Sequence, residues 1–190
     1  MRILFFFLAV SLCAFSQTTV EKVDDKWQMM VDGAPFDIKG ATFGFDKDTA
    51  NYDAYFEDLK FLGVNTIRTW ATGDNTPALL DAAQRHNLKV MVGIWMRHGR
   101  PGMEDDDSFD YLTDKAGMEA MYNGAINTVE TYKDHPAVLT WGIGNEAYLN
   151  MATDEEKLAY SKLLERICAQ IKTLDQNHPI TSVEAWTFGL

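Results

Sequence analysis

The sequence is poor in cysteine and in basic residues, and it has no long apolar run after its N-terminal segment. Its two cysteines are Cys13 and Cys168, and removal of an N-terminal leader would leave Cys168 without a disulfide partner. There are 17 Lys and Arg against 28 Asp and Glu, which gives a formal net charge of −11. This acidity argues against nucleic acid and anionic membrane surfaces as partners. Since no later segment offers the ~20 consecutive apolar residues of a membrane span, we expect no membrane contact after removal of the leader.

The N-terminal segment has the pattern of a secretory signal peptide. A single basic residue is followed by an apolar run at Ile3–Val10 and then by small residues, in the order that signal peptidase requires. We therefore predict that residues 1–16 are removed and that the protein is exported, to the periplasm or the extracellular space. A lipid anchor on Cys13 is the alternative, but Leu12 stands where lipidation signals usually have a small residue.

After the leader, short apolar runs alternate with helical patterns. The apolar runs predict strands at Phe36–Phe43, Asn65–Trp70, Lys89–Met96, Val138–Gly142 and Ile180–Trp186. Helices are predicted between them at residues 51–62, 76–86, 117–133 and 154–174. Asn75 before Thr76-Pro77 and Thr153 three residues before Glu156 are typical helix starts. Such alternation predicts a parallel sheet with right-handed crossovers.

A hairpin is predicted in residues 17–35, ahead of the barrel domain. Trp27–Val31 and Phe36–Lys39 lie on either side of the turn residues Asp32–Pro35, and this pattern is typical of two antiparallel strands. At the other end of the chain, Cys168 lies among leucine and isoleucine side chains at helical spacing. We expect Cys168 to be a buried structural thiol rather than a nucleophile.

Two arrangements of a parallel sheet remain, an open doubly wound sheet and a closed barrel. An open nucleotide-binding sheet has a GxGxxG loop after its first strand, but Gly40–Gly44 lacks that spacing. Instead, polar and aromatic side chains follow the C-terminal ends of the strands, where a barrel assembles its active site. They are Asp46, Arg68, Trp70, Trp95, His98, Asn145, Glu146, Glu184 and Trp186. The sequence therefore predicts an α/β fold, a (β/α)8 TIM barrel over residues 36–190.

The spacing of the strands bears on how much of the barrel is present. Four βα units lie between residues 36 and 180, or about 36 residues each, so eight units need on the order of 290 residues. We therefore expect an incomplete barrel, with about strands 1–5 present, as the N-terminal part of a longer protein. We also expect this chain to be inactive by itself.

Glu146, at the end of the segment Trp141-Gly-Ile-Gly-Asn-Glu146, is the strongest catalytic candidate. Retaining glycoside hydrolysis needs a carboxyl group that protonates the leaving oxygen, ~5–5.5 Å from a carboxylate nucleophile. Packing among Trp70, Trp95 and Trp141 would favour the protonated form of Glu146 by desolvation, as a proton donor requires. The alternative is that Glu146 caps a helix or pairs with an arginine.

Three segments resemble the catalytic barrel of clan A glycoside hydrolases, most closely that of family 2. His135–Glu146 is similar to the fourth strand of these barrels, Leu62–Trp70 to the second and Phe36–Gly40 to the first. The β-1,3-glucanosyltransferases are a more distant likeness. The resemblance spans roughly residues 27–186, and three motifs in the same order are more specific than any one of them.

The resemblance implies roles for three residues. Glu146 would be the acid/base, Asn145 would bind the sugar 2-hydroxyl, and Arg68 would keep the nucleophile ionised. A nearby guanidinium suits the last role, because it lowers the pKa of a carboxylate. The nucleophile itself is implied on a seventh strand, which we do not expect in this chain.

Two further residues at strand ends are candidates for supporting roles. Glu184 shares strand parity with Ser182 and Trp186, so we expect it to contact substrate or a side-chain network rather than to act as the nucleophile. His98 is expected to line the site or orient a carboxylate, with a noncatalytic loop histidine as the alternative. The acidic run Glu104–Asp107 lacks the glycine and the terminal glutamate of a calcium loop, and we expect no metal and no other cofactor.

Three tryptophans, Trp70, Trp95 and Trp186, are expected to stack on sugar rings, whose apolar faces suit indole. Packing within the core is the alternative for each of them. The predicted function is hydrolysis of O-glycosidic bonds in β-linked oligo- or polysaccharides by retaining double displacement. A β-glucan transglycosylase on the same barrel and a noncatalytic carbohydrate-binding barrel are the alternatives. Loop shapes set the sugar and linkage, so the sequence does not predict them.

Overall fold

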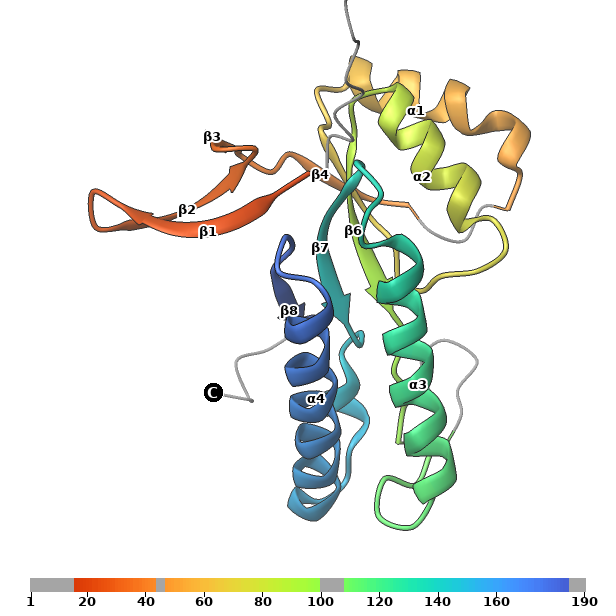
Figure 1. Ribbon diagram of the computed structural model, residues 1–190. Helices are drawn as coiled ribbons and strands as arrows, with labels where there is room; N and C mark the ends of the chain where they lie inside the picture. Colours follow the sequence, from red (N-terminus) through yellow and green to blue (C-terminus); the bar gives the residue numbers. More distant parts are fainter. Residues whose placement is uncertain (1–15, 44–46, 100–107, 185–190) are drawn as a thin grey trace, which may run out of the picture.

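The computed structural model describes residues 16–43, 47–99 and 108–184 (Figure 1). A five-stranded parallel sheet contains β4 (Gly40–Thr42), β5 (Thr66–Arg68), β6 (Lys89–Ile94), β7 (Val138–Ile143) and β8 (Ile180–Ser182), paired in chain order. Its helices are α1 (Tyr52–Phe61), α2 (Thr76–Arg85), α3 (Lys115–Tyr132) and α4 (Asp154–Leu174), with short 3-10 helices η1 (Thr49–Asn51) and η2 (Ala147–Asn150). This is the βα order of a TIM barrel, with five parallel strands in the described residues in place of eight.

The predicted α/β class and the incomplete barrel are confirmed, and every predicted strand and helix of the barrel is present. The helix α4 begins with the predicted capping box, in which Thr153 and Glu156 satisfy each other's backbone N–H groups. At α2 the proline follows the helix start as expected, but the Asn75 side chain makes no capping bond and instead donates to the Tyr52 hydroxyl, 2.7 Å away. Among the described residues, none of the helices has the length and apolar character needed to cross a membrane.

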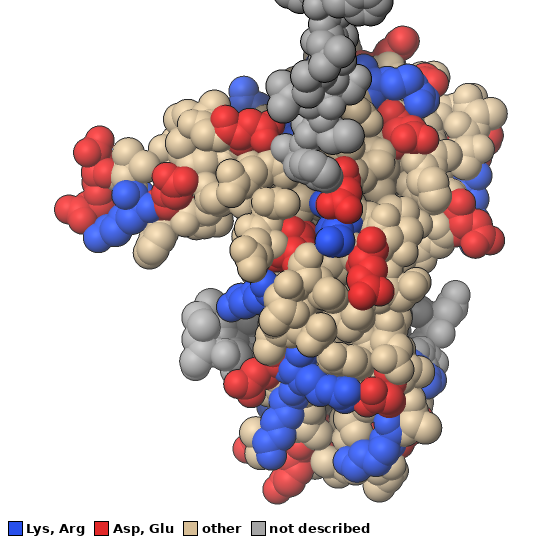
Figure 2. Space-filling view, in the orientation of Figure 1, with Lys and Arg blue, Asp and Glu red and all other residues tan. Residues whose placement is uncertain are grey.

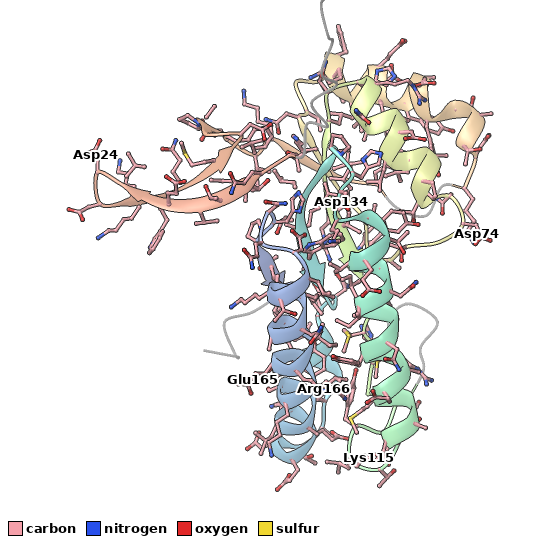
Figure 3. All side chains as sticks on the ribbon, viewed as in Figure 1. Asp24, Asp74, Lys115, Asp134, Glu165 and Arg166 are labelled. Carbon is pink, nitrogen blue, oxygen red and sulfur yellow. The ribbon has the colours of Figure 1, made fainter. Side chains whose placement is uncertain are left out.

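An antiparallel sheet of three strands precedes the barrel strands and projects to one side of them (Figure 1). It contains β1 (Thr18–Val23), β2 (Lys26–Val31) and β3 (Ala34–Pro35). The predicted turn is present at Asp32 and Gly33, with φ of 51° and 77°, but the second arm is Ala34–Pro35 rather than Phe36–Lys39. The strand β1 was not predicted. It is joined to β2 by a turn at Asp24 and Asp25, and Asp24 lies at the tip of the sheet (Figure 3).

The base of this antiparallel sheet is attached to the N-terminal ends of the barrel strands. The Thr18 amide donates to the carbonyl of Asn177, just before β8, at 2.7 Å. The Lys89 ammonium, at the start of β6, donates to the Ser16 hydroxyl at 2.6 Å and to the Pro136 carbonyl at 2.8 Å. The N-terminal segment is therefore bonded at the end of the sheet opposite to the one where a barrel places its active site.

The core lies between the parallel sheet and its helices. Alternate residues of the central strands face the helices and are at most 4% exposed: Val90, Val92 and Ile94 of β6, and Trp141 and Ile143 of β7. The long helices α3 and α4 lie side by side (Figure 1), joined by two hydrogen bonds from the Arg166 guanidinium to the Glu119 carboxylate, at 2.6 and 2.9 Å. Cys168 on α4 is only partly buried, against expectation, and burial raises the pKa of its thiol.

Charged side chains of both signs are interspersed on the surface. Figure 2 shows Asp and Glu side chains next to Lys and Arg over the antiparallel sheet and the upper helices, with basic side chains more frequent over α3 and α4. The groove between these two helices is lined by Lys115, Lys162 and Arg166, but also by Glu119 and Glu155. The excess of acidic residues in the composition therefore does not gather into one patch on this face.

Trp141 is held in the core by a buried carboxylate. Its indole Nε1 donates to Asp175 Oδ2 at 2.8 Å, and the same oxygen accepts from His178 Nδ1 at 2.8 Å. The other oxygen, Oδ1, accepts from the Asn177 amide at 2.8 Å. The prediction that Trp141 packs around Glu146 is wrong, because Trp141 faces the helices, where its indole bonds Asp175, and not the barrel interior.

The Asp175 carboxylate should make stability depend on acid pH. Burial raises its pKa, but the hydrogen bonds from His178, Trp141 and Asn177 outweigh burial and leave the pKa below its ordinary value of 3.8. A carboxyl with a lowered folded-state pKa stabilises the fold above its unfolded pKa, and this stability is lost as the pH falls through the folded pKa.

We therefore expect Asp175→Asn to lower the free energy of unfolding at pH 7 by about 2–3 kcal/mol, since it leaves buried donors facing an amide. Urea unfolding from pH 7 to pH 3 should show a shallower decline below pH ~4 for the variant than for the wild type. Asp134→Asn, at an exposed position before β7 (Figure 3), is the control and should unfold like the wild type. Parallel acid profiles for Asp175→Asn and the wild type would contradict this assignment.

Candidate active site

The backbone turns sharply where β7 ends, and this turn places Glu146. Gly144 has φ of 74°, and Glu146 has φ of 55° and ψ of 29°, a left-handed conformation that side chains other than glycine rarely adopt. The Gly144 amide donates to the Ile94 carbonyl at 2.9 Å, and the Glu146 amide donates to the Val183 carbonyl at 2.8 Å. The turn is thus bonded to the strands on both sides of β7, and the partly buried Glu146 lies at the C-terminal end of the sheet.

Arg68 and Asn145, for which the resemblance implied separate roles, come together next to Glu146. Arg68, the last residue of β5, donates from Nη2 to Asn145 Oδ1 at 2.6 Å. Asn145 is only 6% exposed. The Arg68 guanidinium also lies 6.0 Å from the ring of Trp70, which is partly buried. A pair of residues that lie 77 apart in the chain therefore meets at the predicted end of the sheet.

His98 contacts the same segment, but through the backbone. Its Nε2 lies 2.9 Å from the carbonyl oxygen of Asn145, and because a carbonyl only accepts, Nε2 carries the proton. The imidazole is 2% exposed and stacks on Trp95, with ring centroids 5.0 Å apart and an angle of 29°. The structure thus shows His98 bonded to the peptide group that precedes Glu146. That His98 lines the site or orients a carboxylate stays a prediction.

Glu184 lies after β8 and reaches the residues that follow Glu146. Its Oε2 accepts from the Tyr148 amide at 3.2 Å, and its Oε1 accepts from the Ser182 hydroxyl at 3.4 Å. Burial is the main cause that raises the pKa of the Glu184 carboxyl above its ordinary value. The hydrogen bonds from Tyr148 and Ser182 oppose this rise, and the negative charge of Glu146 adds to it. The two carboxyl groups therefore share one electrostatic environment.

Tyr160 supports the turn from behind and was not predicted as part of the site. Its hydroxyl is buried and has no hydrogen-bond partner within the described residues. It lies so close to Gly144 that a Cβ added there would be 2.6 Å from the hydroxyl oxygen. Burial raises the pKa of this phenol well above its ordinary value, so the phenol stays neutral. In the sequence, Tyr160 lies within the predicted helix 154–174, and no motif distinguishes it as a site residue.

Two predicted site residues, Trp186 and Asp46, lie outside the described residues. The acidic run Glu104–Asp107, for which no site was predicted, and nearly all of the predicted signal peptide also lie outside the described residues. Within residues 16–43, 47–99 and 108–184, no three His, Cys, Asp or Glu side chains are grouped so that they could hold a metal ion.

A hollow lies on the inner face of the sheet, on the side away from the helices. It is lined by residues of β4, β5 and β6, among them Gly40, Thr42, Thr66, Arg68 and Met91. In a closed barrel this face carries the interior side chains, and the strand ends above it carry the active site. Arg68 belongs both to the hollow, which it lines, and to the strand ends above it, where it bonds Asn145.

Comparison with known proteins identifies relatives for most of the chain. Residues 37–188 match the family model described as glycosyl hydrolases family 2, TIM barrel domain. Mannan endo-1,4-beta-mannosidase F of Aspergillus clavatus is 24% identical in an alignment of 205 positions. The alignment covers 80% of this chain and 46% of the relative. Mannan endo-1,4-beta-mannosidase 8 of Oryza sativa subsp. japonica is 26% identical over 198 residues, covering 80% and 53%. The chain thus spans about half the length of the curated relatives that it matches.

Solved structures of family 2 glycosyl hydrolases share the fold. A family 2 member from Bacteroides cellulosilyticus has a TM-score of 0.66 at 20% identity, over 89% of this chain and 21% of that chain. The beta-D-glucuronidase of Dictyoglomus thermophilum has a TM-score of 0.67 at 22% identity, over 89% and 29%. These identities are low and show the fold alone. Because the family model matches 37–188, the resemblance inferred from the sequence is confirmed, and the chain belongs to the glycosyl hydrolases of family 2 through their TIM barrel domain.

Proposed function

We propose that this chain carries the acid/base half of the active site of a retaining glycoside hydrolase that acts on β-linked glycans. The observation that carries the proposal is the turn after β7. It places Glu146 at the C-terminal end of the sheet and Asn145 next to it, with the Asn145 amide held by Arg68. Residues 36–190 would be the catalytic-barrel portion and 17–35 an N-terminal hairpin segment. The N-terminal pattern supports an exported protein.

In the first chemical step, Glu146 gives its proton to the glycosidic oxygen as the bond from that oxygen to the anomeric carbon breaks. A second carboxylate, expected on a seventh strand, attacks the anomeric carbon from the opposite face. In the second step, the Glu146 carboxylate takes a proton from water while the water oxygen displaces the enzyme carboxylate. Two inversions leave the β-configuration unchanged. Glu146 therefore serves once as an acid and once as a base.

Asn145 and Arg68 suit supporting roles in this scheme. The bond from Arg68 uses Asn145 Oδ1 as the acceptor, which directs the amide donor Nδ2 away from the guanidinium. An amide donor beside the acid/base is suited to hold a sugar hydroxyl. The positive charge of Arg68 at the same strand end would favour the ionised form of an approaching carboxylate. Trp70 and Trp95, both partly buried near the strand ends, are proposed to contact sugar rings.

The names of the curated relatives give the first substrate to test. Those relatives are mannan endo-1,4-beta-mannosidases, so we propose a β-1,4-linked mannan or a related β-linked polysaccharide as the substrate of the whole protein. A transglycosylase on the same site would use a sugar hydroxyl in place of water in the second step. The two activities share the first step and differ only in the acceptor.

The test is the configuration of the first product. We expect the whole protein, mixed with β-1,4-manno-oligosaccharides, to release the β-anomer first, with the α-anomer appearing only by later mutarotation. Proton NMR of the anomeric signals at early times measures this order. Initial release of the α-anomer would contradict the retaining mechanism. Oligosaccharides longer than the substrate would identify the transglycosylase, and binding without turnover would identify a noncatalytic barrel.

A further inference from the structure

The segment that carries Glu146 is held by the end of β8 at two points, one on each side of the glutamate. We propose that Glu184 is a positioning residue for Glu146. Its carboxyl fixes the first turn of η2 and thereby the direction in which the Glu146 side chain points. This inference rests on the proposed function, in which Glu146 is the acid/base.

The conformation of Glu146 explains why such support is needed. A residue with a Cβ in the left-handed region costs roughly 1–2 kcal/mol relative to the right-handed one. Such a conformation persists only where the surrounding structure imposes it. The neighbouring Gly144 is also at positive φ, so the segment has two unusual backbone conformations within three residues. Without bonds on both sides, the chain would relax and Glu146 would point elsewhere.

The bond before the glutamate comes from the backbone of β8. The Glu146 amide donates to the Val183 carbonyl at 2.8 Å, and the Val183 amide in turn donates to the Ile143 carbonyl at 3.1 Å. These bonds continue the β7–β8 ladder past the last paired residues, Ile143 and Ser182. They fix the backbone nitrogen of Glu146, but they do not fix the backbone direction of the residues that follow it.

The bond after the glutamate comes from the Glu184 side chain. The first amides of a helix have no partner within the helix, and Tyr148, the second residue of η2, is one of them. Glu184 Oε2 accepts this amide proton at 3.2 Å. The carbonyl of Val183 and the carboxyl of Glu184, on adjacent residues, therefore hold the backbone at Glu146 and at Tyr148. The turn between these two points is the one that carries the acid/base.

An oxygen acceptor, and not a negative charge, is what this role requires. Glutamine keeps an acceptor oxygen on a side chain of the same length, so Glu184→Gln can preserve the bond from Tyr148. Glu184→Ala removes the acceptor oxygen and leaves the Tyr148 amide without this hydrogen bond. A nucleophile or a general acid would instead need the carboxyl itself. The pair of variants thus separates positioning from chemistry.

The test compares two substrates in the whole protein. A β-glycoside with a poor sugar leaving group needs full protonation by Glu146, whereas one with an activated aryl leaving group does not. We expect Glu184→Ala to lower kcat/KM about 10–100-fold on the first substrate, as misplacement of a catalytic group by about 1 Å does. On the aryl substrate, we expect Glu184→Ala to lower kcat/KM by less than about threefold. For Glu184→Gln, kcat/KM should be within about threefold of the wild-type value on both substrates.

Glu165→Ala is the matched control, since Glu165 is an exposed glutamate on α4 (Figure 3) and should leave both rates unchanged. Equal losses on both substrates in Glu184→Ala would overturn the proposal, since a general effect on folding or binding does not depend on the leaving group. A folded Glu184→Gln with the same loss as Glu184→Ala would also overturn it. Thermal unfolding of each variant shows that the compared proteins are folded.

Glu146→Gln in the same assay separates this inference from the proposed function. If Glu146→Gln shows a loss that depends on the leaving group and Glu184→Ala does not, the positioning role fails and the acid/base assignment stands. If Glu146→Gln loses equally on both substrates, the acid/base assignment fails and the positioning role fails with it.

Discussion

Glu146→Gln is expected to lower kcat/KM on a β-glycoside with a poor leaving group by about 10³-fold, within the range that general acid–base catalysis supplies. The amide cannot protonate the departing oxygen, so the first bond cleavage must proceed with an alkoxide-like leaving group. On an aryl glycoside with an acidic phenol, the loss in kcat/KM should stay below about tenfold, because this constant reports only the steps up to the first irreversible one. Steady-state kinetics with both substrates measures the difference.

For the same variant, the second step supplies a further check. On the aryl substrate, kcat should fall more than kcat/KM, since Glu146 also acts as the base that activates water. Azide, a nucleophile that needs no base, should restore kcat and give a β-glycosyl azide product. A variant that azide does not rescue, and that loses equally on both substrates, would place the acid/base on another residue.

Gly144→Ala is expected to destabilise the fold by about 2–5 kcal/mol and to abolish most activity. A Cβ at φ of 74° costs roughly 1–2 kcal/mol. The same Cβ would lie 2.6 Å from the Tyr160 hydroxyl oxygen, and relief of such overpacking typically costs about 1–3 kcal/mol. Tyr160 is fully buried, so it has little room to move away. Urea unfolding monitored by tryptophan fluorescence measures the loss.

Two variants show which part of this cost is steric. Gly124→Ala on α3, where a Cβ meets nothing within 4 Å, should be neutral or stabilise by up to ~1 kcal/mol, because alanine is the better helix former. Tyr160→Phe removes the oxygen that the new Cβ meets, together with a buried hydroxyl that has no partner in the described residues. The double variant should recover the steric part and keep the cost of the positive φ. A Gly144→Ala protein as stable as Gly124→Ala would contradict the geometry of the turn.

The helices could be predicted closely because their ends carry local chemical signals. The predicted helix over 154–174 coincides with α4 (Asp154–Leu174), since the capping box at its start depends only on residues three apart. Strand ends carry no such signal. Within the described residues, the predicted strand Ile180–Trp186 forms β8 over Ile180–Ser182, and Val183 continues the backbone bonds to the end of β7. The strand β1 was missed because its turn consists of two aspartates at positive φ rather than the Asn-Gly or Asp-Gly that signals a tight hairpin.

The site was predictable where it depends on residue type and not where it depends on the backbone. Arg68 and Asn145 were assigned together because both lie at strand ends in recognisable motifs. The partner of His98 is a backbone carbonyl, which every residue has, so no sequence pattern could identify it. The left-handed turn at Glu146 and its bond to β8 arise from packing between strands that are far apart in the chain.

The bond between Thr18 and Asn177 has a consequence for the order of folding. The antiparallel sheet is synthesised before any part of the barrel, and its hairpin contacts are local, so β1 and β2 can pair early. Its anchor is the backbone just ahead of β8, which leaves the ribosome only after four βα units have been made. Until then, the barrel bond available to its base is the one from Lys89 of β6 to the Ser16 hydroxyl. The antiparallel sheet therefore completes its attachment to the barrel only after the residues before the fifth barrel strand have been made.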